Sequence, residues 1–404
     1  MNKQNETRIK WIFFDFGGVL AEEGFLQGLQ DLGRIKGIDQ EVAFQKGHEL
    51  IYSTGYLLGE GPESAFWDAM RRELNFEDSD EHLRSLMLKR FLPREWMFVL
   101  AEELKSQGFY TAILSDQVDW LDKLDEQYCF YSKFDKVFNS FELGKSKRET
   151  EIFSHVCQTL EISPEEALFL DDSSSNIQRA WESGMRGIEY RDRNQFLKDL
   201  SKDFPYINLP ANKENLETAF QTQFSEEDAH YLSELVYPCL DQESINYEEI
   251  PFTEDIKNEY ILMAFEERLL IPVQAKQESC WEERGLKVFP GESYFMPRMS
   301  KNLLQMASIT GKFEPEQAMR ELLNECGQKN ITLIIDYMMQ LKQQVHGFKI
   351  NADKMLKLAH ELELSEDLHD LADLFVILGF LSPSRSGTLA EGMAKYEINP
   401  CLFW

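Results

Sequence analysis

Residues Trp11–Leu20 read WIFFDFGGVL, which is four apolar residues, an aspartate and, shortly after it, a pair of glycines. The apolar run has the length of a short buried strand, and Asp15 stands where that strand would end. A carboxylate there is held by a rigid strand and faces the crevice in which α/β sheets bind ligands, as a nucleophile toward phosphorus requires. The segment therefore predicts a parallel sheet with an acidic site at its carboxyl edge.

Short apolar runs alternate with helical patterns through the first two hundred residues. Parallel sheets produce this alternation because helices cover both of their faces. The further runs are Tyr110–Leu114, Lys136–Asn139, Leu168–Leu170 and Gly187–Tyr190, and the helical patterns are Glu95–Ser106, Val118–Glu126, Glu149–Leu160 and Ser175–Ser183. We expect a Rossmann-like, doubly wound α/β domain over residues 1–201.

One interval breaks this alternation, because roughly ninety residues separate the first strand from the second. Phe25–Met87 has helical patterns and no strand pattern. An insertion placed directly after the first strand lies at the carboxyl edge of the sheet. We therefore predict a core of residues 9–21 and 95–201 with a helical cap, or lid, over about residues 22–94.

Two further elements place polar residues after predicted strands. Ser115 and Asp116 follow YTAIL, where the hydroxyl could bind a transferring phosphoryl group, although a Ser-Asp helix cap has the same pattern. Lys147 lies in the loop SFELGKSK after KVFN, where it could bring positive charge to a carboxylate and a phosphate or be a solvated lysine. Neither element is specific by itself.

The fourth element is a doubled acid, Asp171-Asp172, directly after the apolar run LFL. Adjacent carboxylates repel one another, and a hard divalent cation is the main means of stabilising them at a strand end. Asn176 follows one helical turn beyond Asp172. Helix capping explains one acid here and leaves the second unexplained.

These four elements, in this order and each after a predicted strand, resemble the haloacid dehalogenase-like superfamily of Mg²⁺-dependent phosphohydrolases, in particular members with a helical cap. The resemblance covers about residues 9–200, half of the chain. It implies an aspartyl-phosphate on Asp15, and Mg²⁺ bound by Asp15, the Gly17 carbonyl and Asp172, with help from Asp171. By the same resemblance, the supporting residues are Ser115 for the phosphoryl oxygens, Lys147 for charge balance, and Asn176 and Asp116 around the site.

The sequence departs from the family at one position. Phosphatases of the superfamily usually have a second Asp two residues after the nucleophile as the general acid and base, and here that residue is Gly17. Positioned proton transfer is typically worth about 10²–10⁴-fold in rate. The expected function is a phosphohydrolase acting on a small phosphorylated metabolite. The alternatives are a weak or inactive module retained for binding or regulation, and other chemistry on this fold, with dehalogenation least favoured because family dehalogenases lack the Asp-Asp pair.

The predicted cap offers polar candidates for the site. Arg71 is the natural partner for a substrate anion. His48 is either a polar cap residue or the missing acid, whereas Trp67 and Met70 have the spacing of a cap core. The remaining candidates are Glu22, Glu23, Tyr52, Tyr56 and Glu60.

Acidic residues exceed basic ones, 71 Asp and Glu against 42 Lys and Arg among 404 residues, and the formal net charge is −29. The excess is similar in residues 1–200 (−13) and 201–404 (−16). This charge disfavours nucleic acid and anionic membrane surfaces as partners. Six widely spaced cysteines, without a metal-binding pattern or a long apolar span, indicate a cytoplasmic protein.

The second half contains no catalytic pattern. Residues 202–215 look like a linker, and residues 216–404 look like a mostly helical interaction or regulatory domain that binds a protein partner. Leu269–Gln274 and Leu286–Phe289 could form a hairpin, and a helix Asp367–Leu378 followed by two strands suggests a winged-helix-like segment over about residues 365–404. The helical patterns are Met299–Ser308, Glu316–Cys326, Thr332–Gln344 and Ala352–Leu362.

Overall fold

The computed structural model describes residues 8–204, 209, 211–240, 242–273, 290–345, 347–362, 364, 368–382 and 395–404. The chain divides into two compact units, Met1–Leu209 and Pro210–Trp404. Each unit has its own hydrophobic core.

A five-stranded parallel sheet forms the centre of the first unit, in the strand order β3-β2-β1-β4-β5. This order confirms the predicted doubly wound α/β fold. The central strand β1 pairs with β2 on one side and β4 on the other, so that Phe14 lies opposite Ile113 and Leu170. The strands are Trp11–Phe14 (β1), Tyr110–Ser115 (β2), Lys136–Asn139 (β3), Ala167–Asp171 (β4) and Arg186–Glu189 (β5).

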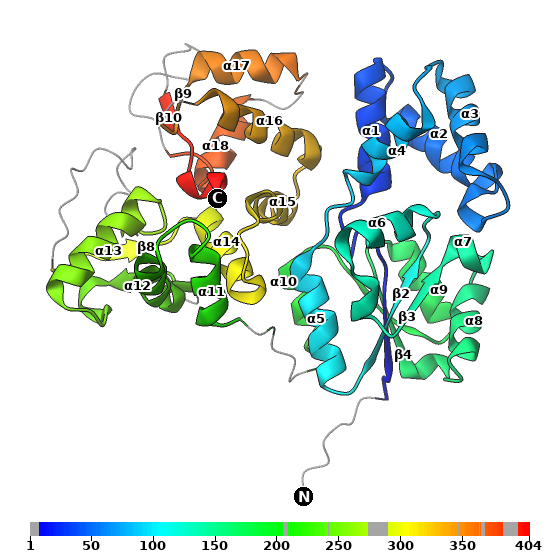
Figure 1. The fold of residues 1–404 in the computed structure, drawn as a ribbon, viewed down its shortest axis with the longest axis horizontal. Coiled ribbons are helices and arrows are strands. Elements are labelled where there is room, and N and C mark those ends of the chain that lie inside the picture. Colours follow the sequence, from blue (N-terminus) through cyan, green and yellow to red (C-terminus); the bar gives the residue numbers. More distant parts are fainter. Residues whose placement is uncertain are drawn as a thin grey trace, which may run out of the picture. The chain divides into compact units, whose positions relative to one another are not determined.

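Helices cover both faces of this sheet, with α8 and α9 on one side and α5 and α10 on the other (Figure 1). Alternate residues of each strand face the two layers, so Phe13 and Phe169 pack in one cluster with Phe153 of α8. On the opposite face, Trp96 of α5 contacts Phe196 of α10. The helices are Glu95–Ser106 (α5), Trp120–Tyr128 (α6), Ser140–Leu143 (α7), Glu151–Thr159 (α8), Ser174–Glu182 (α9) and Arg193–Leu200 (α10).

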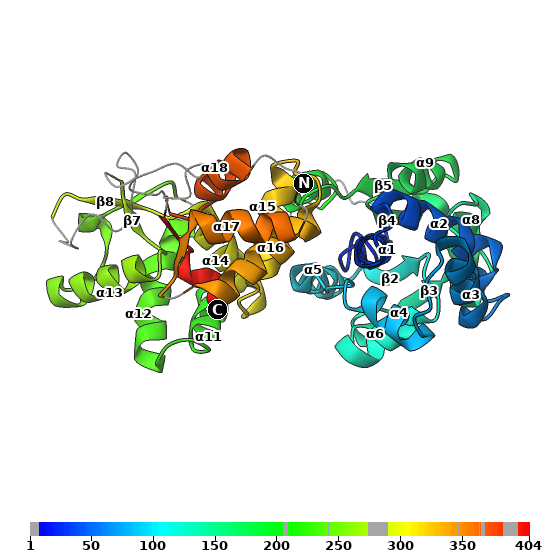
Figure 2. The same cartoon turned by 90° about the horizontal axis from the view of Figure 1, so that it is seen from above.

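A helical insertion separates β1 from α5, as the long interval in the sequence predicts. Figures 1 and 2 show its helices gathered at the carboxyl end of the strands. Trp67 and Met70 are fully buried within it. The helices are Gly24–Lys36 (α1), Gln40–Ser53 (α2), Glu63–Leu74 (α3) and Asp80–Leu88 (α4), with a short 3₁₀ turn at Tyr56–Leu58.

The two chain segments that join the insertion to the sheet domain pair with each other. Ala21 forms an antiparallel bridge with Pro93. The Glu22 amide donates to the Leu92 carbonyl at 2.9 Å, and the Arg94 amide donates to Leu20 at 2.8 Å. The buried Arg94 guanidinium also binds the Gly18, Val19 and Ala21 carbonyls and pairs with Glu22. The loop after β1 is thereby tied to the point where the insertion ends.

The second unit is mostly helical. Its core gathers residues from α11, α12, α13 and α14. Short strands form two small sheets with the orders β6-β8-β7 and β10-β9. The elements are Lys213–Phe220 (α11), Glu226–Val236 (α12), Ile245–Asn246 (β6), Glu254–Glu266 (α13), Ile271–Pro272 (β7), Ser293–Phe295 (β8), Arg298–Thr310 (α14), Pro315–Glu325 (α15), Ile331–Gln344 (α16), Lys349–Asn351 (β9), Ala352–Glu361 (α17), Leu368–Leu378 (α18) and Lys395–Glu397 (β10).

One boundary in this unit differs from that expected from the sequence. Helix α11 begins at Lys213, inside the range 202–215 that reads as a linker, because the Asn212 side chain accepts a hydrogen bond from the Asn215 amide and caps the helix. The strand β7 pairs with β8, antiparallel. The expected hairpin partner, Leu286–Phe289, and Gln274 lie outside the described residues.

The end of the chain contains the expected helix, α18, followed by an antiparallel bridge between Leu381 and Ile398. The strand β10 then pairs with β9, which precedes α17 in the chain. Residues 383–394 of the expected hairpin lie outside the described residues. Over the described parts of the chain, no helix combines the length and apolar character needed to cross a bilayer.

Candidate active site

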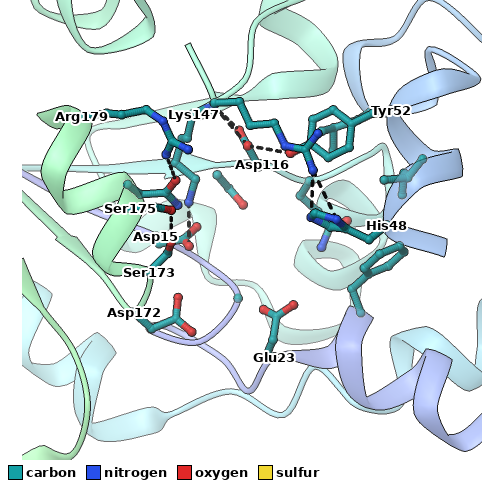
Figure 3. A pocket seen from close by; sticks show the side chains of 18 of the residues that line it. Asp15, Glu23, His48, Tyr52, Asp116, Lys147, Asp172, Ser173, Ser175 and Arg179 are labelled. Atoms are coloured by element: carbon teal, nitrogen blue, oxygen red, sulfur yellow. Dashed lines mark hydrogen bonds and ion pairs between the residues drawn. The ribbon is translucent and has the colours of Figure 1, made fainter. Parts of the chain in front are cut away.

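A cavity of about 440 Å³ lies at the carboxyl ends of β1, β2 and β4, beneath the helical insertion. The sheet domain contributes Asp15, Ser115 and Lys147 to its lining, and the insertion contributes Glu23 and Tyr52. In Figure 3 the side chains of Glu23 and Tyr52 lie opposite those of Asp15 and Lys147. Polar residues from both parts of the unit therefore line one cavity.

Asp15 is held at the end of β1 by the backbone on both sides. Its amide donates to Leu170 at 2.8 Å, which continues the pairing of β1 with β4. Its Oδ1 accepts from the Phe16 amide at 2.7 Å, and its Oδ2 lies 2.6 Å from Lys147 Nζ. The side chain is only 10% exposed, so one carboxylate is fixed toward the cavity in a single orientation.

Lys147 connects the first carboxylate to a second one. Its Nζ lies 2.8 Å from Asp171 Oδ2. Asp171 also accepts from the Ser173 amide at 2.8 Å and from Asn176 Nδ2 at 3.1 Å, and it is fully buried. The loop that carries Lys147 is held in place by Asp116, because the Lys147 amide donates to Asp116 Oδ1 at 2.8 Å.

The three carboxylates of Asp15, Asp171 and Asp172 each offer an oxygen within 4.8 Å of the others. Burial raises the pKa of Asp15 well above its ordinary range; Lys147 opposes this, and Asp171 and Asp172 add to it. Withdrawal from bulk water, and then the charge of Asp171, raise the pKa of Asp172 to about 6. Burial by itself would lower the pKa of Lys147, but Asp15, Asp171 and Asp116 outweigh burial and raise it above its usual range. The cluster thus carries more negative charge than its lysine balances.

Gly18 shows how closely the doubled acid packs against the loop after β1. Its φ of +80° is a conformation that side chains other than glycine rarely adopt. A Cβ at this position would lie 2.1 Å from Asp172 Oδ2, which is far inside van der Waals contact. The second glycine of FDFGG is therefore required by both backbone and space.

Most of the sequence-predicted residues meet at this cavity. Ser115, Asp116 and Asn176 line it, and Asp171 lies beneath it among the hydrogen bonds described above. Arg71 is placed elsewhere. Its guanidinium pairs with Asp68 at 2.8 Å and Asp80 at 2.7 Å within the insertion, and it does not line the cavity.

The arginines that do line the cavity are Arg148 and Arg179, which sequence reasoning missed. Arg148 follows Lys147 directly, and Arg179 lies one helical turn beyond Asn176. Both arginines are therefore close in sequence to residues that the motifs identify. Arg179 donates to Asn176 Oδ1 at 2.8 Å. The Arg148 guanidinium stacks 3.4 Å from the centre of the Tyr52 ring.

The insertion reaches the sheet domain through two side chains of α2. His48 lies 3.1 Å from Arg148, and the Tyr52 hydroxyl lies 3.4 Å from Asp116 Oδ2 (Figure 3). Burial, and then Arg148, lower the pKa of His48. These contacts place His48 beside a cation and make it a polar group at the rim of the cavity.

Glu23 is the acidic residue of the insertion that approaches the loop after β1. It lines the cavity between α1 and that loop (Figure 3). Burial, and then the charge of Asp172, raise its pKa to about 7. Its neighbour Glu22 points to Arg94 instead, at 3.1 Å. The sequence offered both as candidates without distinguishing them.

The model of a family described as haloacid dehalogenase-like hydrolase matches residues 9–180, which hold β1, the insertion, Lys147 and the doubled acid. Residues 9–180 are therefore similar to this family, and the match confirms the resemblance that the four motifs indicate. A second model, described simply as a family, matches residues 214–404.

Relatives of the haloacid dehalogenase-like region include well-described hydrolases. The rat bifunctional epoxide hydrolase 2 is 36% identical over 125 residues, which cover 28% of this chain and 22% of that protein. The D-ribitol-5-phosphate phosphatase of Bacteroides thetaiotaomicron is 26% identical over 223 residues, which cover 48% of this chain and 97% of that enzyme. A solved family enzyme from the same bacterium, in complex with magnesium and inorganic phosphate, is 24% identical with a TM-score of 0.37 and covers 45% of this chain and 93% of its own.

Asparagine substitutions at Asp171 and Asp172 should move the stability of the metal-free protein in opposite directions. D171N removes a buried charge that Lys147 and Asn176 contact, and loss of one partner of such a pair costs about 3–5 kcal/mol. The pKa of Asp172 is raised to about 6 in the folded protein, so its charged form destabilises the fold once the pH rises through this value. D172N removes this carboxylate. Its melting temperature should exceed that of the parent at pH 8, and the gain should shrink toward pH 4.

Thermal unfolding in chelator at pH 8 and pH 4 measures both effects. A D172N protein that melts below D171N at pH 8 would contradict the division of roles between the two acids.

Proposed function

We propose that the first unit hydrolyses small phosphate monoesters, with Asp15 as the nucleophile. The observation that supports this most directly is the position of Asp15 Oδ2, which lies 2.6 Å from Lys147 Nζ in the lining of a polar cavity. Attack by this oxygen on phosphorus would form an aspartyl-phosphate and break the ester bond, and water would then release inorganic phosphate. Lys147 stays protonated and offsets the charge that gathers around Asp15 during both steps.

We also propose that Mg²⁺ is the cofactor. The residues present fit this ion, since the available donors are the carboxylates of Asp15 and Asp172 and the backbone carbonyl of Gly17, all of them hard oxygen ligands. The raised pKa of Asp172 indicates negative charge that the chain leaves unbalanced. When bound, Mg²⁺ would act as a Lewis acid toward the phosphoryl oxygens.

The remaining lining residues fit a small phosphorylated substrate. Ser115 closes β2 with a hydroxyl toward the cavity, and Arg148 and Arg179 bring positive charge to its rim. A cavity of about 440 Å³ has the size of a small-ligand site. The insertion then acts as a cap that excludes water, because α2 touches the sheet domain through Tyr52 and His48. D-ribitol 5-phosphate, named for one relative, belongs to the size class that we propose.

A binding or regulatory module with slow turnover is the second candidate, and Gly17 is the observation that favours it. Without a side chain at this position, the acid and base of the family must come from elsewhere or be absent. The two candidates predict different results in the same phosphatase assay.

Turnover should depend on both Asp15 and a divalent ion. D15N removes the attacking oxygen while keeping the shape of the side chain, so we expect phosphatase activity to fall by at least about 10³-fold, as for loss of a covalent nucleophile. Inorganic phosphate release from a panel of sugar, polyol and aryl phosphates, with Mg²⁺ or with chelator, measures this. A panel that stays inactive with Mg²⁺ supports the binding module.

Magnesium should also raise the melting temperature of the parent protein, because a ligand of the native state stabilises it by RT ln(1 + [L]/Kd), about 2.7 kcal/mol at a hundredfold excess over Kd. D172N should abolish most of this shift, whereas D78N, at an acid of the insertion that pairs with Lys36, should keep it. Thermal unfolding across a Mg²⁺ titration is the measurement. An equal shift in D172N would place the ion elsewhere.

For the second unit we propose a protein-docking role built on a winged-helix-like segment. The support is the order α16, β9, α17, α18, followed by the Leu381–Ile398 bridge and the pairing of β10 with β9. The acidic balance of residues 201–404 favours a protein over nucleic acid.

The full chain should therefore bind a labelled DNA duplex no more tightly than about 100 µM at physiological salt, the weak end of non-specific binding. Fluorescence anisotropy measures this, and a dissociation constant below about 1 µM would overturn the docking assignment in favour of nucleic acid.

A further inference from the structure

Gly17 is the position at which the loop after β1 lacks a side chain close to Asp15. The backbone does not require glycine there, because Gly17 is absent from the glycines with positive φ, whereas Gly18 has a φ of +80°. What a side chain at position 17 would meet is the Glu23 carboxyl group. A Cβ built on Gly17 would lie 2.6 Å from Glu23 Oε2 and 3.6 Å from Glu23 Cδ.

The Glu23 carboxyl group thus occupies the volume that a residue at position 17 would fill. The distance from Glu23 Oε2 to the Cβ built on Gly17 is comparable to the distance between the Cβ and a carboxylate oxygen within one aspartate. The Glu23 carboxyl group therefore lies beside position 17, although it comes from a different part of the chain. A side chain at position 17 and the Glu23 carboxyl group in its present position would therefore compete for the same space.

The fold brings Glu23 to this place through the segment that leads into the insertion. Glu23 precedes α1, one residue after the amide of Glu22 bonds to Leu92. The first residue of α1 is also restricted to glycine by space, because a Cβ on Gly24 would lie 2.4 Å from the Phe91 ring. The close approach of α1 to Phe91 holds Glu23 over the loop.

Glu23 is not among the acids that we assign to Mg²⁺. Among the described residues, the acidic cluster with oxygens within 4.8 Å of one another consists of Asp15, Asp171 and Asp172. Glu23 lines the same cavity as Asp15, from the side of the insertion (Figure 3). It is therefore placed to act on the substrate from the face opposite Lys147.

We propose that Glu23 is the general acid and base of the reaction, in place of the carboxylate that position 17 lacks. The inference rests on the proposed phosphatase function. In the first step, Asp15 Oδ attacks phosphorus, the bond between phosphorus and the ester oxygen breaks, and the protonated Glu23 gives its proton to that oxygen, so that an alcohol leaves. In the second step, the Glu23 carboxylate takes a proton from water as the water oxygen attacks the aspartyl-phosphate. Asp15 and inorganic phosphate are released, and Glu23 is again protonated.

A leaving-group comparison tests the acid role. Phenyl phosphate needs a proton on its leaving oxygen far more than 4-nitrophenyl phosphate does, and kcat/KM reports only the steps up to departure of that group. We expect E23Q to lower kcat/KM by about 10²–10⁴-fold for phenyl phosphate and by less than about tenfold for 4-nitrophenyl phosphate. E77Q, at an exposed acid of the insertion, should match the parent with both esters.

Intact mass measurement tests the base role in the same variant. With 4-nitrophenyl phosphate, E23Q should accumulate a phosphorylated protein because water is no longer activated, and E23Q/D15N should not. The parent should show little phosphorylated protein at steady state.

A rescue variant separates a proton-transfer role from a structural one. E23A should lose activity on phenyl phosphate and vacate the space beside Gly17, and E23A/G17D should recover at least tenfold of that loss. Thermal unfolding of every variant checks that the fold is retained.

The outcomes are distinct. An equal loss for both esters in E23Q, without phosphorylated protein, would overturn the proposal while leaving an Asp15-dependent phosphatase in place. A parent that hydrolyses neither ester with Mg²⁺ would overturn the phosphatase function and the role of Glu23 together.

Discussion

The placement of one buried lysine between two carboxylates is the interaction on which the site depends. Lys147 Nζ lies 2.6 Å from Asp15 and 2.8 Å from Asp171, at the ends of two adjacent strands. In a medium of low dielectric constant, an unpaired charge of either sign would be costly, so each of the three groups requires the others. The strand ends, the loop of Lys147 and the start of α9 are positioned together because these charges must meet.

The sheet and much of the site were predictable because they depend on local signals. Apolar runs bounded by polar residues gave the positions of β1 to β5 within one or two residues, and helix α5 was predicted at its observed bounds. Asp15, Lys147 and Asp171 could be recognised because each follows a strand of the same sheet, whose carboxyl edge brings them together. The order of four motifs along the chain carried information that no single motif carried.

Features that depend on distant contacts could not be predicted in the same way. Arg71 looked like an anion-binding residue, but Asp68 and Asp80 within the insertion bind its guanidinium. Glu22 and Glu23 are adjacent and chemically equivalent, and only the position of Arg94 and of the loop after β1 decides which one faces the cavity. The pairing of β10 with β9 joins segments more than forty residues apart, and neither strand has a periodicity long enough to identify its partner.

The paired segments at the base of the insertion also set its mechanics. The chain enters the insertion near Ala21 and leaves it near Pro93. Because these two residues lie side by side, the two connecting segments form one hinge for the insertion. Glu23 sits two residues from that hinge and has a short lever arm, whereas Tyr52 and His48 are at the far rim, where they meet Asp116 and Arg148. A swing wide enough to admit a ligand past the rim would therefore displace Glu23 very little, so that entry and proton transfer need not compete for the same motion.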